Sequence, residues 1–179
     1  ISDPYNRLMV TVCATAGCSG STGGGTPPPP TPVGGVYVTP SVTIAATSVA
    51  GFSTYTLTAT LGATAGNLYS IYGSVASPLS FPPAFQVAAP FGSNIGGVAP
   101  ALSAAMADAA YDSWLTVGVT DNGATTAVSA IGIDFASWST TSGLLTTDGA
   151  VFWMDPTAQA LVGADTVVAQ ITVADGTVA

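Results

Sequence analysis

Apolar and polar residues alternate along much of this chain, and that alternation predicts β-strands. The clearest case is the run 52–61, in which Tyr55, Leu57, Ala59 and Leu61 alternate with threonines. Such a strand has one apolar face and one face of hydroxyl groups. Similar runs predict further strands at residues 36–38, 41–45, 68–72, 84–88, 113–120, 128–135, 150–154 and 166–174.

The segments between these runs carry the residues that turns require. They include Asp121-Asn122-Gly123, Asp148-Gly149, Asp155-Pro156 and Asp175-Gly176. Short strands with frequent turns predict an all-β fold, an Ig-like β-sandwich. Only residues 100–108, rich in alanine, have a helical pattern, so at most one short helix is expected. Pro40 predicts an edge strand or a bulge, and residues 77–97 are expected to form a long irregular connection.

The N-terminal residues have a strand pattern of their own. Leu8, Val10 and Val12 share one face of a strand predicted from residue 7 to 13. The following Gly/Ser/Thr-rich segment contains four consecutive prolines, which impose extended polyproline II. A lone strand is not stable in water, and the spacer separates this one from the rest of the chain, so another subunit's sheet is its natural host. We therefore divide the chain into a donor-strand arm (1–16), a spacer (17–35) and a β-sandwich domain (36–179).

The composition excludes several classes of function. Of the 179 residues 48% are hydrophobic and only 6% charged, with a mean hydropathy of +0.56 and a net charge of −8. Arg7 is the only basic residue, which argues against nucleic-acid binding and polybasic membrane binding. No run is apolar for long enough to predict a membrane span. A surface this poor in charge is expected to be covered by neighbours or by sugar. The chain begins at Ile1 without a leader, which predicts a mature extracellular product.

The two cysteines, Cys13 and Cys18, are close enough in sequence to form a small-loop disulfide where the first strand ends. Paired cysteines in secreted chains are usually oxidised, and two free thiols are the alternative. Zinc would need more ligands than these two residues supply.

Candidate chemistry is confined to aspartates and tryptophans. Asp108 and Asp112, four residues apart, would share a helix face as an acid and base pair, with a cap or turn role for Asp112 as the alternative. A serine nucleophile would have no histidine or lysine to activate it. We expect no enzymatic activity and no cofactor. Two further alternatives are a structural Ca²⁺ at a loop and a sugar-binding aromatic platform, for which the residues are Asp121, Asn122 and Asp134, and Trp114, Trp138 and Trp153. Solvated turns and core packing are the competing interpretations.

The spacer has the composition of an O-glycosylated stalk. None of the four asparagines is followed two residues later by Ser or Thr, so N-linked sugar is not expected. Thr26 and Thr31 flank the proline run, and the sequence Thr26-Pro27-Pro28-Pro29-Pro30-Thr31 resembles the Ser/Thr-Pro-Pro-Pro-Pro units of hydroxyproline-rich cell-wall glycoproteins of plants and green algae. That resemblance implies O-linked glycans on these residues, with the prolines hydroxylated.

A tethered N-terminal strand followed by a β-sandwich is similar to pilus subunits that assemble by donor-strand complementation. The stretch from Tyr111 to Met154 also resembles β-rich modules in secreted proteins of planktonic algae. The sequence therefore predicts a structural subunit of an extracellular, pilus-like filament, a helical homopolymer and cell-surface appendage. Its expected interface residues are Arg7, Leu8, Val10 and Val12, with Arg7 either paired with an Asp of the accepting subunit or solvated. The alternatives are a monomeric carbohydrate-binding or adhesive domain, and a small secreted hydrolase that uses Asp108 and Asp112.

Overall fold

The computed structural model describes residues 38–62, 68–121, 127–154 and 165–177. Their strands, in chain order, are β1 (Val38–Ile44), β2 (Phe52–Leu61), β3 (Ser70–Gly73), β4 (Leu79–Phe81), β5 (Trp114–Leu115), β6 (Val128–Ile131), β7 (Leu144–Thr146), β8 (Gly149–Trp153) and β9 (Asp165–Ala174). Between β4 and β5 lie the helix α1 (Pro100–Ala105) and the 3-10 segment η1 (Ala107–Tyr111), and a second 3-10 segment, η2 (Phe135–Ser137), precedes β7.

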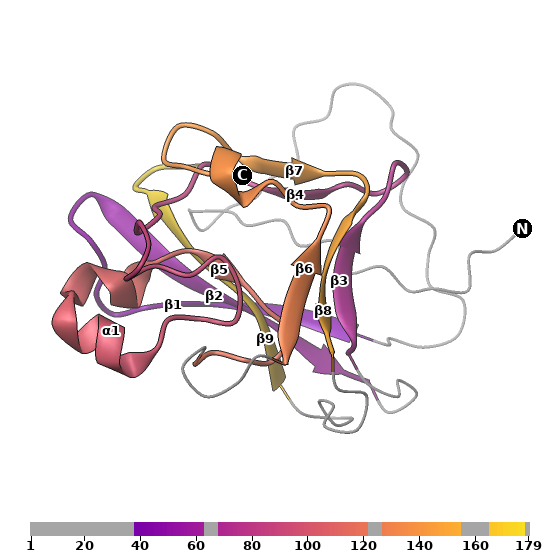
Figure 1. Cartoon of the computed structure of the whole chain (residues 1–179), viewed down its shortest axis with the longest axis horizontal. Helices are drawn as coiled ribbons and strands as arrows, with labels where there is room; N and C mark the ends of the chain where they lie inside the picture. The colour runs from indigo at the N-terminus through magenta and orange to yellow at the C-terminus, as the bar shows by residue number, and fades with distance from the viewer. Residues whose placement is uncertain (1–37, 63–67, 122–126, 155–164, 178–179) are drawn as a thin grey trace, which may run out of the picture.

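The strands form antiparallel sheets. A four-stranded sheet has the order β1-β2-β9-β5, a three-stranded sheet has the order β3-β8-β6, and β4 pairs with β7. In Figure 1 the three-stranded sheet stands above one end of the four-stranded sheet, and the β4–β7 pair crosses the top. The all-β fold with one short α-helix, predicted from the sequence, is confirmed.

The core fills the space between the sheets. The apolar face of β2 points inward, with Leu57 opposite Ala169 and Tyr55 opposite Ile171 on β9. Ile71 and Val151 come from the three-stranded sheet, and all six belong to one cluster of buried side chains. Because side chains alternate between the faces of a strand, the threonines of β2 lie on its outer face, as the sequence pattern predicted.

One end of that outer face is covered by the connection that follows β4. The Phe52 and Phe85 rings lie 5.6 Å apart, and the backbone N–H of Phe85 donates to Thr172 of β9 at 2.7 Å. Beneath them Thr54 and Thr172 are buried, and their hydroxyls form a hydrogen bond of 2.8 Å. The Thr54 hydroxyl also forms a hydrogen bond of 2.6 Å with the hydroxyl of the partly buried Ser48, whereas Thr54 is the partner of the Thr172 hydroxyl.

Several predicted boundaries are wrong, each for a local reason. Residues 84–88 form no strand, because Pro82 and Pro83 precede them and Val87 donates its N–H to a side chain instead of a strand. The strand predicted at 113–120 ends at Leu115, since the Thr116 hydroxyl bonds both the C=O and the N–H of Val119 in a tight turn.

The strand predicted at 128–135 ends at Ile131. Gly132 follows with a positive φ of 68°, and the Asp134 carboxylate then caps η2 by accepting the N–H of Ala136. The helix ends at Ala105 and gives way to η1. The three-residue strands β4 and β7 were not predicted, because such short runs have no periodicity of their own.

The Thr54–Thr172 pair gives a test of the packing. Thr54→Val leaves the Thr172 hydroxyl buried without its partner, which costs about 1–3 kcal/mol of the free energy of unfolding. Adding Thr172→Val removes the stranded hydroxyl, so the double variant is expected to lose clearly less than the sum of the two single variants. Urea unfolding of all four proteins measures the coupling, and strictly additive losses would contradict the assigned hydrogen bond.

Candidate functional site

The two edges of the four-stranded sheet differ. Beyond β5 the sheet is extended by residues 94–96, since the Leu115 N–H donates to the Asn94 C=O at 3.0 Å and its C=O accepts from Gly96 at 2.9 Å. On the opposite side β1 pairs with β2 alone among the residues that the structure describes. Within the described part of the chain, the sheet therefore has one covered edge and one open edge.

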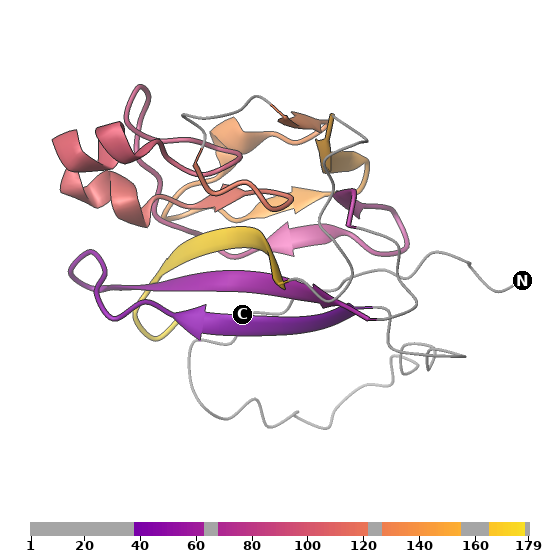
Figure 2. The same ribbon diagram turned by 90° about the horizontal axis from the view of Figure 1, so that it is seen from below.

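The open edge carries apolar side chains that face inward without being buried. Val42 lies opposite Leu57 and Ile44 opposite Tyr55, so all four are on the core side of the sheet. Val42 and Ile44 are nevertheless 45% and 63% exposed, whereas Leu57 and Tyr55 are 1% and 7% exposed. Val42 and Ile44 are exposed because β1 lies on the side of the sheet that is furthest from β6 and β8, as Figure 2 shows, so the three-stranded sheet does not cover them.

The backbone at this edge is also available. Just after β1 ends, the Ala45 N–H donates to the Thr54 C=O of β2 at 2.9 Å. In an antiparallel ladder, the backbone N–H and C=O of one residue both point to the same neighbouring strand, and those of the next residue point the other way. The backbone groups of the odd-numbered residues of β1 therefore point to β2, and those of Val42 and Ile44 point away from the sheet, in its plane. Pro40, an even-numbered residue, therefore costs the β1–β2 ladder no hydrogen bond.

The edge strands of the three-stranded sheet do not combine these features. Ile71 of β3 is buried in the core, and Val128 and Ala130 of β6 pack against it. Both strands are four residues long, whereas β1 has seven. Short edge strands with covered side chains resist the addition of another strand, so β1 is the edge suited to accept one.

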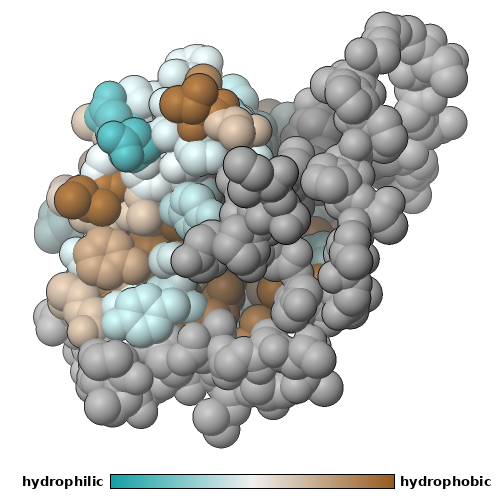
Figure 3. Space-filling model, turned by 90° about the vertical axis from the view of Figure 1, so that its right-hand side faces the viewer, coloured by the Kyte–Doolittle hydropathy of each residue, from teal (hydrophilic) through white to brown (hydrophobic). Residues whose placement is uncertain are grey.

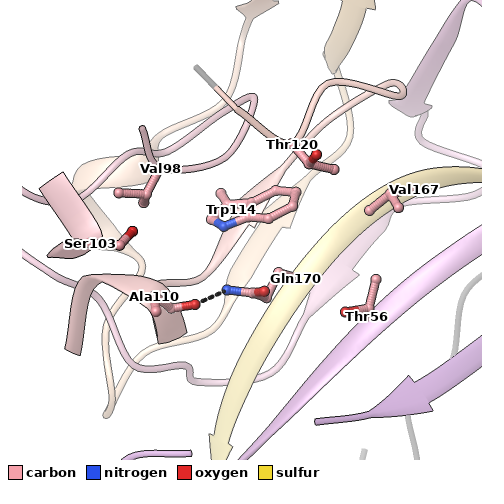
Figure 4. Close-up of a pocket in the computed structure, with 8 residues that line it drawn as sticks. All are labelled: Thr56, Val98, Ser103, Ala110, Trp114, Thr120, Val167 and Gln170. Carbon is pink, nitrogen blue, oxygen red and sulfur yellow. Dashed lines mark hydrogen bonds between the residues drawn. The ribbon is translucent and has the colours of Figure 1, made fainter. Parts of the chain in front are cut away.

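A pocket of about 270 Å³ lies on the outer face of the four-stranded sheet, where α1 and η1 fold over it. Figure 4 shows Trp114 of β5 in its middle, with Gln170 of β9 beside it. The Gln170 amide donates to the backbone C=O of Ala110 at 3.0 Å and of Asp112 at 2.8 Å, which ties η1 to the sheet. The residues that line the pocket are Thr56, Val98, Ser103, Ala110, Trp114, Thr120, Val167 and Gln170.

A second hollow, of about 340 Å³, lies on the three-stranded sheet and is lined by residues that include Tyr72, Ile131 and Asp148. Tyr72 and Ile131 are exposed there. Figure 3, which views the molecule from the side of β3, shows hydrophobic and hydrophilic residues side by side on its coloured part.

Asp112 holds the connection between β4 and α1 in place. Its side chain is fully buried, and its two carboxylate oxygens accept the backbone N–H groups of Val87 at 2.7 Å and Ser93 at 2.6 Å. Gly92 lies so close that a Cβ there would meet Val87 O at 1.8 Å and Asp112 Oδ2 at 2.9 Å. Burial raises the pKa of Asp112 to about 6, against the opposing effect of backbone hydrogen bonds from Val87, Ser93 and Ser113.

The two aspartates singled out in the sequence have different surroundings. Asp108 is exposed on η1, whereas Asp112 is buried with both oxygens bonded to backbone, as a cap or turn residue would be. No group of three or more potential metal-ligating side chains occurs in the described part of the chain. Asp134, one of the calcium candidates, caps η2.

The three tryptophans occupy separate places. Trp138 is 3% exposed, with its indole N–H donating to Pro82 O at 2.9 Å, and Trp114 is 5% exposed. Trp153 belongs to β8, and its indole nitrogen is buried without a hydrogen-bond partner. Trp138 belongs to the core cluster, as expected for core packing, whereas Trp114 is buried on the outer face of the sheet, where it lines the pocket.

The residues expected to form the interface, disulfide and glycosylated segment lie outside the described residues. They are Arg7, Leu8, Val10, Val12, Cys13, Cys18, Thr26, Pro27, Pro28, Pro29, Pro30 and Thr31. Sequence reasoning missed the exposed inner face of β1, the pocket and the role of Gln170. Pro40 indicated that β1 is an edge strand, and Gln170 stands out as the one amide in an apolar strand. Neither signal shows which residues of the folded chain lie beside it.

Comparisons with protein-family models, curated proteins and solved structures found no match. Among the described residues, no helix has both the length and the hydropathy that crossing a membrane requires.

The Asp112 site predicts an unusual pH dependence. Its folded pKa of about 6 lies above the ordinary value of 3.8, so between these values the folded protein binds the proton more tightly than the unfolded chain. The contribution of Asp112 to the free energy of unfolding therefore falls as pH rises from 4 to 7, by at most roughly 3 kcal/mol.

Urea unfolding at pH 4, 5, 6 and 7 measures this effect, with Asp112→Asn as the control. The variant is expected to be less stable, because its amide N–H₂ faces a backbone N–H. Its free energy of unfolding is also expected to lack the part of the pH dependence that comes from Asp112. An identical pH slope in both proteins would show that another group titrates.

Proposed function

We propose that this chain is a structural subunit of an extracellular, pilus-like filament in which the strand at residues 7–12 of one copy adds to β1 of the next. The observation that carries the proposal is the open edge at Val42 and Ile44, with exposed inward-facing side chains and outward-facing backbone groups. Strand addition uses both features, since backbone hydrogen bonds supply affinity and alternate side chains supply specificity.

The donor pattern matches this acceptor in period. Leu8, Val10 and Val12 recur at every second residue, and Val42 and Ile44 are spaced in the same way on the exposed inner face of β1. Fully burying such a side chain contributes roughly 1.5–3 kcal/mol. The added strand lies beyond β1, where contact with Val42 and Ile44 buries its side chains in part, so the three supply a fraction of that energy each against the entropy lost on association.

Pro40 restricts where the incoming strand can pair. It offers no N–H at an outward-facing position, so continuous pairing is confined to the C-terminal half of β1. An interruption of this kind disfavours the addition of unrelated strands along the whole edge. It also favours one register for the strand that does add.

Charge plays a small part in this assembly. Arg7 is the only basic side chain, next to Leu8 of the donor strand, and the acidic side chains with which it can pair are all aspartates. An exposed pair of that kind is worth less than about 1 kcal/mol, so it adjusts the register and apolar burial provides the affinity. The spacer at residues 17–35 then connects each sandwich domain to the strand it donates.

Two complementary variants test the proposal. Deleting residues 1–12 removes the donor strand and leaves the acceptor edge, whereas Val42→Lys with Ile44→Lys charges the acceptor edge and leaves the donor strand. Neither protein alone is expected to form filaments by negative-stain microscopy, because burying a lysine beside the donor side chains is costly. Mixed together, they are expected to form a complex of two chains with a single joint.

The matched control is Ser41→Lys with Thr43→Lys, which places the same two charges on the outer face of β1. It is expected to polymerise like the parent chain. Filaments formed by the deletion variant would overturn the proposal. Filaments formed by the doubly charged variant would show that the donor strand binds somewhere other than β1.

The spacer gives a separate prediction. Its prolines donate no backbone hydrogen bonds and its composition cannot form a core, so we expect an exposed segment that carries O-linked sugar on Thr26 and Thr31, and on Pro27–Pro30 once they are hydroxylated. The intact mass of material from its native source is expected to exceed the 17.5 kDa of the polypeptide. A mass equal to that of the bare chain, corrected for a disulfide, would contradict the modification.

A further inference from the structure

The pocket beneath α1 has the chemistry of a site for a neutral, hydroxyl-rich ligand. Its floor is a row across the sheet, because Thr56 lies opposite Gln170 and Gln170 opposite Trp114. Ser103 of α1 and Thr120, which follows β5, complete the polar lining. This row is on the outer face, whereas the side chains at the open edge of β1 face inward, so the two sites are separate.

Gln170 has a fixed orientation in this pocket. Its Nε2 donates to the carbonyl oxygens of Ala110 and Asp112, which uses both of its N–H groups. Figure 4 shows the amide oxygen on the side away from Ala110. An acceptor held in place by two hydrogen bonds loses no side-chain freedom when a ligand binds to it.

The hydroxyls around this acceptor are free to bind a ligand. Those of Thr56, Ser103 and Thr120 have no hydrogen-bond partner among the described residues, and each can both donate and accept. No charged side chain lines the pocket, and the whole protein has a net charge of −8. An anion would find no cation here and a cation would find no carboxylate, so the pocket suits an uncharged ligand.

Size and shape narrow the ligand further. A volume of about 270 Å³ is below that of most sites for drug-sized molecules, which favours a single ring. Trp114, Val98 and Val167 supply apolar contact, and the hydroxyls and the Gln170 oxygen supply hydrogen bonds. Since Trp114 is only 5% exposed, it contributes part of a wall and the polar groups carry most of the recognition.

We propose that this pocket binds one neutral pyranose ring of a carbohydrate. The site is independent of the filament interface, so either proposal stands if the other fails. For a ligand of about a dozen non-hydrogen atoms, the expected dissociation constant is roughly millimolar.

The test titrates the full chain with D-glucose, D-galactose, D-mannose, D-xylose and L-arabinose, followed by tryptophan fluorescence and saturation-transfer NMR. At least one of these sugars is expected to bind at one site. Thr56→Val and Ser103→Ala each remove one hydroxyl and are expected to weaken binding roughly 3- to 10-fold. Ser103→Leu fills the pocket and is expected to abolish binding.

Thr43→Val is the matched control, because Thr43 lies opposite Thr56 on the same face of the sheet and does not line the pocket. It is expected to bind like the parent chain, and circular dichroism verifies that each variant is folded. The absence of binding to all five sugars at 100 mM would overturn the proposal. So would binding that Ser103→Leu and Thr43→Val leave equally unchanged.

Discussion

The pairing of β9 with both β2 and β5 is the constraint on which the rest of the described structure depends. β9 begins more than 100 residues after β2 ends, yet it occupies the middle of the four-stranded sheet. Its inward residues complete the core, while Gln170 holds η1 and Thr172 holds the connection at Phe85. Because β9 takes the inner position, β1 is left at the edge, so one pairing creates both the open strand and the floor of the pocket.

Hydrogen bonds between neutral groups connect distant segments of the described chain, as ion pairs do in many other proteins. The Thr54–Thr172 hydroxyl pair, the Gln170 amide and the Ser113 hydroxyl each join segments far apart in the sequence. Carboxylates also take part, as Asp175 and Asp165 accept from Ser53 and Thr60 on the surface. Asp112 differs from these two because it is buried, with its carboxylate held by backbone N–H groups and no cation among its contacts. Such a group organises a loop well, because one side chain satisfies several donors, but it pays a desolvation cost that depends on pH.

The fold class was predictable because strand alternation and turn residues are local signals. β2 was predicted with its observed bounds, and Pro40 correctly indicated an edge strand. The short strands β4 and β7 were not predictable, since each forms only by pairing with the other across more than 60 residues of sequence. The early end of β5 comes from a local turn between Thr116 and Val119, which the run of apolar residues at 113–120 concealed. The pocket depends on Gln170, Trp114 and Ser103 from three separate elements, and no spacing in the sequence relates them.

The scarcity of charge gives the two proposed surfaces a common character. The edge at Val42 and Ile44 would be recognised by apolar burial and backbone hydrogen bonds, and the pocket by hydroxyls and an amide. Neither mechanism relies on Coulomb attraction, so dissolved salt screens little of either. Aspartates on the remaining surface still repel between copies, and salt weakens that repulsion. A filament built in this way would hold together at least as well in high salt as in low salt, unlike assemblies held by complementary charges.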